Sequence, residues 1–196
     1  NSRGGYMKMS EHLVTMMQGI SDPRIPFYCT LDTSGTYSGT PLGSVDQSTS
    51  DVGSYFASPS NPLPLVTYVE AKFIEAEANM ILGNGGPAAD AHNAAVAAHV
   101  MMVTGASDPV FEAAQAAETS ATISMEKILM HKYIAMFSHV EAYSDWRRTD
   151  YPSLSPNPNG ILNAIPRRLP MSGDERVNNP NATVVNDILS PVWWDE

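Results

Sequence analysis

The sequence predicts an all-α protein with a helical core, a loop-rich insertion before the core and an extended tail after it. Three observations support this prediction. Apolar residues recur at helical spacing between residues 65 and 150. Residues 29–64 are rich in Ser, Thr, Gly and Pro without a sustained period, and seven prolines follow Tyr151. We therefore expect residues 1–196 to form one domain with a capping insertion (29–64), a helical core (65–150) and a wrapping tail (151–196).

The first predicted helix lies near the start of the chain. Ser10 is a suitable N-cap for a short amphipathic stretch from Glu11 to Gln18, and Gly19 ends it. Residues 22–26 (DPRIP) follow, with two prolines. Because residues before proline avoid the α conformation, we expect this segment to be extended.

Two longer helices follow the insertion. A helix from about Thr67 to Leu82 is predicted by apolar residues at helical spacing, namely Val66, Val69, Phe73, Ala76 and Met80. After a glycine-rich break, Pro87 is well placed to start a second helix over residues 87–103. The expected close-packing face of this helix is Ala91, Ala95, Ala98 and Met102. Two helices joined by a short turn form an αα-hairpin, here similar to a tetratricopeptide unit.

Two further helices complete the predicted core. Asp108 and Pro109 cap a short helix that runs to about Ala117, and a longer helix is expected from Ile123 to Ser138. The apolar face of the longer helix would consist of Met125, Leu129, Tyr133, Met136 and Val140. Beyond Tyr151 the prolines exclude a long helix. The apolar residues of the tail predict that it packs on the core; they are Leu154, Ile161, Ile165, Leu169, Trp193 and Trp194.

Composition excludes several classes of function. The chain has 21 acidic and 11 basic residues and a net charge of −10, so nucleic-acid binding is not expected. It has one cysteine, Cys29, and therefore no internal disulfide and no cysteine-based metal site. It contains no apolar run of the length that a membrane span needs. It opens on residues 1–5 (NSRGG), so we expect a longer protein whose export signal lies upstream.

Short matches to catalytic patterns do not predict an enzyme. Ser124 and Lys127 have the spacing of a serine–lysine pair, but the partner motifs of that enzyme class are absent from the chain. Residues 32–35 (DTSG) are better explained as a turn than as an aspartic-protease loop. The histidines of the helices cannot chelate one metal as i, i+4 pairs and are expected on polar or interhelical faces; they are His92, His99, His131 and His139. We expect no cofactor.

Arginine and tryptophan are concentrated near the end of the chain. We call the following residues the clasp: Glu141, Asp145, Trp146, Arg147, Arg148, Arg167, Arg168, Trp193 and Trp194. Guanidinium groups bind carboxylates through paired hydrogen bonds and stack on indole rings. Because Glu141, Asp145, Glu175 and Asp195 supply carboxylates nearby, we favour an ion-pair network that holds the tail to the long helix over an anion-binding site. Trp146, Trp193 and Trp194 are expected to be buried.

Several of these segments resemble the SusD/RagB family. The motifs that carry the resemblance are residues 67–78 (TYVEAKFIEAEA), 141–152 (EAYSDWRRTDYP), 165–179 (IPRRLPMSGDERVNN) and 192–195 (VWWD). Residues 22–24 (DPR) also fit. The matching segments occur in the family's order over nearly the whole chain. The chain resembles the C-terminal half of the family's proteins. One departure is Met171, where the family often has an aromatic residue, and we expect this change to loosen the local packing of the tail.

The resemblance implies a fold and a function. The fold would be a tetratricopeptide-like α-α superhelix with a capping subdomain. The protein would be a surface-exposed lipoprotein of the Bacteroidetes outer membrane that binds oligosaccharides, or peptides, without catalysis. It would close as a lid over a SusC-like TonB-dependent transporter. The lipid anchor and several helices would belong to an N-terminal half upstream of this chain, and Cys29 is not that anchor.

Aromatic residues of the insertion and its edge are the candidate ligand contacts. They are Tyr28, Tyr37, Tyr55 and Phe56, because aromatic rings cover the C–H faces of sugars. The alternative for each is a structural role in the capping insertion. For the whole chain the alternatives are a helical scaffold or assembly module without a small ligand, and a hydrolase whose catalytic residues lie upstream.

Overall fold

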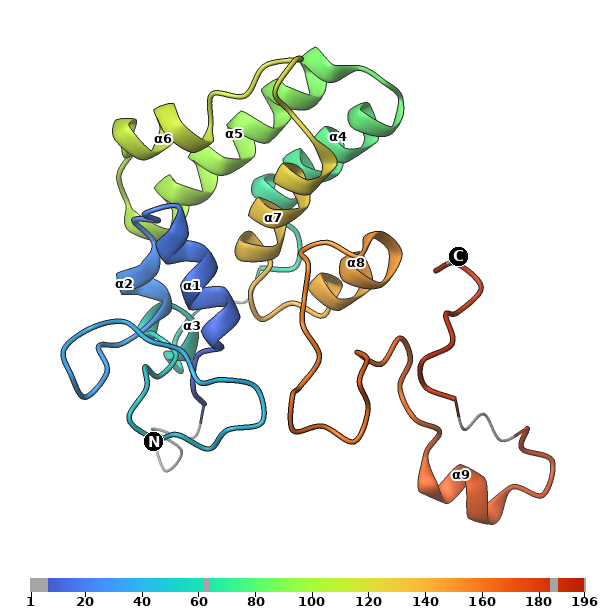
Figure 1. Cartoon of the computed structure of the whole chain (residues 1–196). Helices are drawn as coiled ribbons and strands as arrows, with labels where there is room; N and C mark the ends of the chain where they lie inside the picture. Colours follow the sequence, from blue (N-terminus) through green and yellow to red (C-terminus); the bar gives the residue numbers. More distant parts are fainter. Residues whose placement is uncertain (1–6, 62–63, 184–186, 196) are drawn as a thin grey trace.

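The computed structural model describes residues 7–61, 64–183 and 187–195, and these ranges are helical (Figure 1). The only strand-like pairings in the described ranges are three isolated backbone bridges. The helices are α1 (Glu11–Gly19), α2 (Ile25–Tyr28), α3 (Ser54–Ala57), α4 (Tyr68–Ile81), α5 (Gly85–Thr104), α6 (Pro109–Gln115), α7 (Met125–Ala135), α8 (Glu141–Thr149) and α9 (Gly173–Asn178). The prediction of an all-α protein is confirmed. The opening residues 1–5 lie outside the described ranges.

The predicted αα-hairpin is formed by α4 and α5, which lie side by side in Figure 1. Thr67 caps α4, because its side chain accepts a hydrogen bond of 3.0 Å from the N–H of Glu70. Gly83 adopts a φ of 77° in the turn, a conformation that glycine takes without strain. Val69 and Phe73 of α4 pack against the alanines and valines of α5, and Ile128 of α7 joins the same core.

The buried face of α5 is broader than expected. Its first residue is Gly85 and not Pro87, since a proline is tolerated anywhere in the first turn, where the N–H groups have no helical partner. Met102, expected in the packing face, is 43% exposed. The histidines His92 and His99 are buried there instead, so α5 is covered on several sides.

The predicted long helix over 123–138 is shorter than expected, and a separate helix, α8, follows it. α7 ends at Ala135, and Ser138 has a φ of 71°, which breaks the helical path. Val140, expected on the buried face, is exposed and immediately precedes α8. The chain therefore turns between α7 and α8, and α8 was not anticipated as a separate element.

The insertion is bound to the start of α1 by backbone hydrogen bonds. The N–H of Thr40 donates to the carbonyl of Met9 at 2.7 Å, and the N–H of Glu11 donates to the carbonyl of Thr40 at 3.1 Å. Gly39 is required at this crossing, because a Cβ there would lie 2.3 Å from the Glu11 backbone. The bridge between Cys29 and Val52 closes the other side of the insertion.

A buried arginine, paired with Asp22, joins this N-terminal region to the hairpin. The guanidinium of Arg24 donates two hydrogen bonds to the Asp22 carboxylate, at 2.8 Å and 2.5 Å, and both residues are buried. Its third nitrogen lies 2.6 Å from Nδ1 of His99 on α5, and the group also lies 5.6 Å from the centre of the Phe111 ring. The prediction that residues 22–26 are extended is wrong: Arg24 is in the αR conformation, and Pro26 lies in the first turn of α2.

Three of the four helix histidines lie between helices. His92 and His131 face each other with ring centres 5.2 Å apart, and both are buried with His99. Burial lowers the pKa of His92, and it lowers the pKa of His131 to about 3. The pKa of His99 lies well below 6.5 because of burial and the nearby Arg24 charge. These side chains are therefore neutral at neutral pH.

The part of the clasp on α8 binds α4 and α7. Arg148 forms ion pairs with Glu77 of α4 and, at 2.6 Å, with Asp145. Lys132 of α7 lies 2.8 Å from Asp145 and 3.4 Å from Glu77. Two cations and two anions are thus shared by three helices. Glu77 was not among the carboxylates expected from the sequence, and Glu141, which was, is exposed with no ion pair in the described residues.

The part of the clasp on the tail packs against α8. Arg147 lies between the rings of Tyr143 and Trp194, 4.5 Å and 4.4 Å from their centres. Arg167 pairs with Asp150 and, at 2.8 Å, with Asp195, whose side chain is buried. Arg168 donates to the carbonyl oxygens of residues 190 and 191. Glu175 does not take part and accepts a hydrogen bond from Asn179 instead.

The tail packs down less than expected. Trp146 is buried as predicted, but Trp193 is 86% exposed and Trp194 is 38% exposed. Ile161 and Leu169, also expected to pack on the core, are exposed. Figure 1 shows the tail running away from the helical core, with α9 apart from the other helices. Backbone and guanidinium contacts hold the tail, so its apolar residues need not be buried.

Removal of two clasp arginines is expected to destabilise the protein. Arg147→Ala with Arg167→Ala leaves the buried Asp195 carboxylate without its cation, so the free energy of unfolding should fall by roughly 3 kcal/mol. Urea titration measures this change. Arg176→Ala, on the exposed face of α9, is the matched control and should change the free energy by less than about 0.5 kcal/mol. An unchanged stability in the double variant would contradict the structural role of the clasp.

Acid is expected to destabilise the protein through the buried histidines. A histidine in the unfolded chain has a pKa of about 6.5, whereas burial lowers that of His131 to about 3. Between these values the unfolded chain binds more protons, so the free energy of unfolding should fall as the pH decreases from 6.5 toward 3. Urea titrations across this range measure the slope, which His131→Gln should reduce. A slope that His131→Gln leaves unchanged would contradict this assignment.

Candidate functional site

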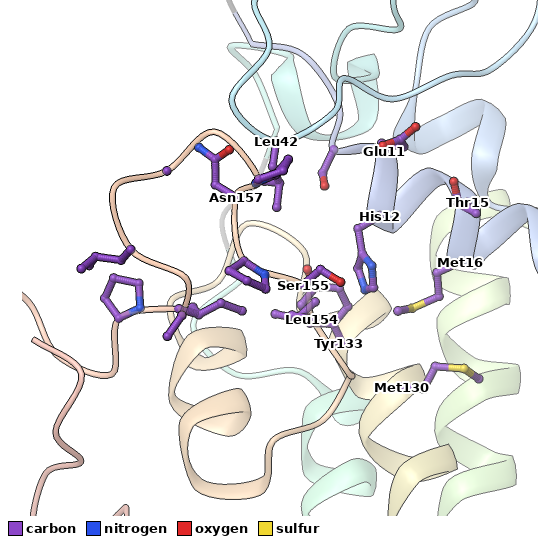
Figure 2. Close-up of a pocket in the computed structure, with 18 of the residues that line it drawn as sticks. Glu11, His12, Thr15, Met16, Leu42, Met130, Tyr133, Leu154, Ser155 and Asn157 are labelled. Atoms are coloured by element: carbon purple, nitrogen blue, oxygen red, sulfur yellow. The ribbon is translucent and has the colours of Figure 1, made fainter.

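A groove of about 1260 Å³ lies between α1, α7 and tail residues 154–166 (Figure 2). Helical spacing explains two of its walls, because side chains three and four residues apart share a face. The α1 wall consists of Glu11, His12, Thr15 and Met16, and the α7 wall consists of Met130 and Tyr133. The third wall is non-helical chain that includes Leu154, Ser155 and Asn157.

The third wall belongs to a loop whose two ends are tied together. Arg167 pairs with Asp150, and the hydroxyl of Tyr143 donates to the carbonyl of Pro166 at 2.6 Å. We call this segment the 150–167 loop. Its far side reaches the capping insertion, where a Cβ on Gly43 would lie 2.5 Å from Oδ1 of Asn157. The groove is therefore enclosed by segments that are remote in the sequence.

The interior of the groove is neutral and mainly apolar. The rings of His12 and Tyr133 meet edge to face with centres 6.2 Å apart. Burial lowers the pKa of His12 and raises the pKa of Tyr133, so both are uncharged at neutral pH. In Figure 2 Glu11 and Asn157 lie on the side of the capping insertion with Leu42 between them, and Met130 lies away from it. The groove thus has its carboxylate and amide on one side and its methionines on the other.

A smaller pocket of about 210 Å³ lies beside α3. Tyr55 and Phe56 of α3 supply its aromatic wall, and their rings meet edge to face with centres 4.9 Å apart. The polar groups of the lining are hydroxyl, amide and imidazole side chains, contributed by Ser58, Asn61, Thr67, Ser138, His99 and His139. We call it the Tyr55 pocket. Aromatic carbon beside hydrogen-bonding groups suits a sugar ring.

The four aromatic residues singled out in the sequence have different positions. Tyr55 and Phe56 are half-buried and line the Tyr55 pocket. Tyr28 is fully buried, and its hydroxyl donates to the carbonyl of Ile134 at 2.7 Å, so it does not fit the surface contact expected of it. Tyr37 is partly buried against the core of α1 and α2 and lines neither the groove nor the Tyr55 pocket.

The groove was not anticipated from the sequence. Its residues come from α1, α7 and the 150–167 loop, and nothing in the local pattern of one segment points to the other two. One signal was available on α1, where Glu11, His12 and Thr15 interrupt an apolar helix on a single face. The two methionines of the groove are also typical of adaptable binding surfaces.

The segments that matched catalytic patterns have structural contacts. Ser124 caps α7 by accepting from the N–H of Lys127, whose ammonium pairs with Glu118 at 2.7 Å. Asp32 accepts hydrogen bonds from Ser34 and Thr36 in a turn. In the part of the chain that the structure describes, no group of three His, Cys, Asp or Glu side chains is placed to hold a metal ion.

Comparisons with known proteins place the chain in a family. Within the described residues, no helix has both the length and the apolar character needed to cross a membrane. A comparison with curated proteins finds no match. A family model described as "Starch-binding associating with outer membrane" (SusD-like) matches residues 1–171. This match covers most of the chain and includes the motifs at residues 67–78 and 141–152, and it ends before the motif at residues 192–195. The chain therefore belongs to the SusD-like family of starch-binding proteins that associate with the outer membrane.

Proposed function

We propose that this chain captures an oligosaccharide without catalysis and that the Tyr55 pocket holds one of its sugar rings. The family supports glycan binding at the outer membrane. The observation that carries the proposal for this pocket is its lining, which combines two aromatic rings with hydroxyl, amide and imidazole groups and contains no carboxylate, lysine or arginine. Sugars are bound through such rings and through directional hydrogen bonds to their hydroxyls.

The size of the Tyr55 pocket supports one sugar ring of a longer ligand. At about 210 Å³ it is smaller than the sites that enclose whole drug-sized molecules. Tyr55 lies at the exposed edge of the aromatic cluster, since Phe56 packs against Tyr28 and Phe137 behind it. A longer glycan would therefore leave this pocket across the Tyr55 ring and continue over the surface.

We further propose that the intact protein is lipid-anchored at the cell surface and delivers its glycan to a TonB-dependent transporter. The association of the family with the outer membrane supports this proposal. Affinity purification of the full-length protein from its own membranes should recover an outer-membrane barrel protein. Recovery of the protein alone, in a fraction without outer membrane, would contradict it.

Truncation of Tyr55 is expected to weaken glycan binding. Tyr55→Ala removes the half-buried ring at the mouth of the pocket, and we expect maltoheptaose to bind at least about tenfold more weakly. Asn61→Ala, which removes a neutral polar group of the same lining, should weaken binding by a smaller factor. Calorimetric titration measures both affinities.

The matched control is Tyr68→Ala. Tyr68 is 60% exposed at the start of α4 and does not line the Tyr55 pocket, so its removal should leave maltoheptaose binding unchanged. Chromatography of maltoheptaose after long incubation with the protein should show no shorter products. Equal binding by the Tyr55 and Tyr68 variants, or tighter binding of an unmodified peptide than of any glycan, would overturn the assignment of this pocket.

A further inference from the structure

The groove between α1, α7 and the 150–167 loop has a different chemistry from the Tyr55 pocket. Its volume of about 1260 Å³ is several times larger, and apolar side chains predominate in its lining. Much of the lining consists of methionine, leucine and proline side chains, including Met16, Met130, Leu154 and Pro166. These offer little to the hydroxyl groups of an unsubstituted glycan. They suit an apolar chain, since methionine adapts its shape to such ligands.

The carboxylate and the amide of the groove lie near the capping insertion. Figure 2 shows Glu11 and Asn157 there, with Leu42 between them, whereas Met16 and Met130 lie away from the insertion. Hydroxyl and imidazole groups of Ser155, Tyr133 and His12 lie between these two parts. Glu11 is exposed at the start of α1, where its carboxylate can accept hydrogen bonds from a ligand hydroxyl, and the Asn157 amide can both donate and accept. A ligand that satisfies both parts is amphiphilic, with a hydrogen-bonding head and an apolar chain.

Charge restricts the head to a neutral one. The groove lining contains one charged side chain, the Glu11 carboxylate, and no lysine or arginine. The whole chain carries a net charge of −10. A fatty-acid carboxylate or a phosphate head would meet an anion with no cation to pair with it. Hydroxyl groups are the head chemistry that Glu11 and Asn157 accommodate.

The groove is also held open by specific contacts. The Arg167–Asp150 pair closes the base of the 150–167 loop, and Asn157 rests on Gly43 of the insertion. Both ends of the third wall are therefore fixed before a ligand arrives, which lowers the entropy lost on binding. The exposed Ile161 at the tip of this loop is available to cover an apolar chain.

We propose that this groove binds a single amphiphile with a neutral, hydroxyl-bearing head and an apolar chain, the chemistry of an alkyl glycoside or a glycolipid. The head lies between Glu11 and Asn157, and the chain lies along Met16 and Met130. This site is separate from the Tyr55 pocket and does not depend on the function proposed for that pocket.

The test uses three ligands that separate the head from the chain. The probe is n-octyl β-D-glucoside, titrated calorimetrically into the purified chain below the concentration at which it forms micelles. We expect saturable binding of one molecule. Methyl β-D-glucoside has the same head without the chain and should bind at least about tenfold more weakly, because it buries far less apolar surface. Octanol has the chain without the sugar and should also bind at least about tenfold more weakly.

Paired variants locate the binding. Met16→Gln with Met130→Gln keeps the side-chain lengths but makes the apolar end polar, and should weaken octyl glucoside binding about tenfold or more. Met101→Gln is the matched control, because Met101 is half-exposed on α5 and lines neither cavity. Circular dichroism of each variant checks that the helices are intact.

Three results would overturn the proposal. They are binding of methyl glucoside as tight as that of the octyl compound, binding of octanol as tight as that of the octyl compound, and equal octyl glucoside affinity in the Met16/Met130 and Met101 variants. The maltoheptaose titrations with Tyr55→Ala test only the Tyr55 pocket, and the octyl glucoside titrations test only the groove. Failure of the groove proposal therefore leaves the Tyr55 pocket untouched, and the converse also holds.

Discussion

The buried Arg24–Asp22 ion pair is the contact on which the relative positions of the two halves of the core depend. Arg24 precedes α2, but its guanidinium reaches His99 on α5 and the Phe111 ring on α6. A buried arginine is tolerated only when its charge is matched, and Asp22 supplies the match two residues away in the sequence. Burial, and after it repulsion by the Arg24 charge, lowers the pKa of His99 and keeps this side chain neutral. The Tyr55 pocket includes His99 in its lining, and the groove depends on where α1 lies relative to α7.

A second charged network fixes the relative positions of α4, α7 and α8. Glu77, Asp145, Lys132 and Arg148 place two negative and two positive charges among α4, α7 and α8. Removing any one of them would leave a partly buried charge without its partner, which makes the group interdependent. The network explains why a mainly polar helix such as α8 lies against the core at all. Trp146 is the single buried residue of α8. Ion pairs therefore attach α8 to the core where it buries few apolar side chains.

The helices were predictable where local signals agreed. For α4, α6 and α7, apolar spacing and a capping side chain point to the same start, and Thr67, Asp108 and Ser124 each accept a backbone N–H in the structure. α8 was not predicted as a separate helix, because its position depends on ion pairs with Glu77 and Lys132, which lie on other helices. Trp193 was expected to be buried because it is large and apolar, yet the tail is attached through arginine contacts that leave it exposed. The Tyr55 pocket could be predicted in part, since Tyr55 and Phe56 are adjacent in the sequence. The groove could not, because three separate segments form it.

The clasp has a consequence beyond the attachment of the tail. Arg167 binds Asp150 at the end of α8 and Asp195 near the end of the chain, so one guanidinium closes the 150–167 loop and also holds the last residues described. Asp150 is largely exposed, whereas the Asp195 side chain is buried, and the two contacts therefore differ in strength. The buried contact fixes Arg167, and the fixed Arg167 then holds the base of the loop. The motif that contains Arg167 thus helps to determine the shape of a groove formed mostly by residues outside that motif, because the anchored ends of a loop restrict its path.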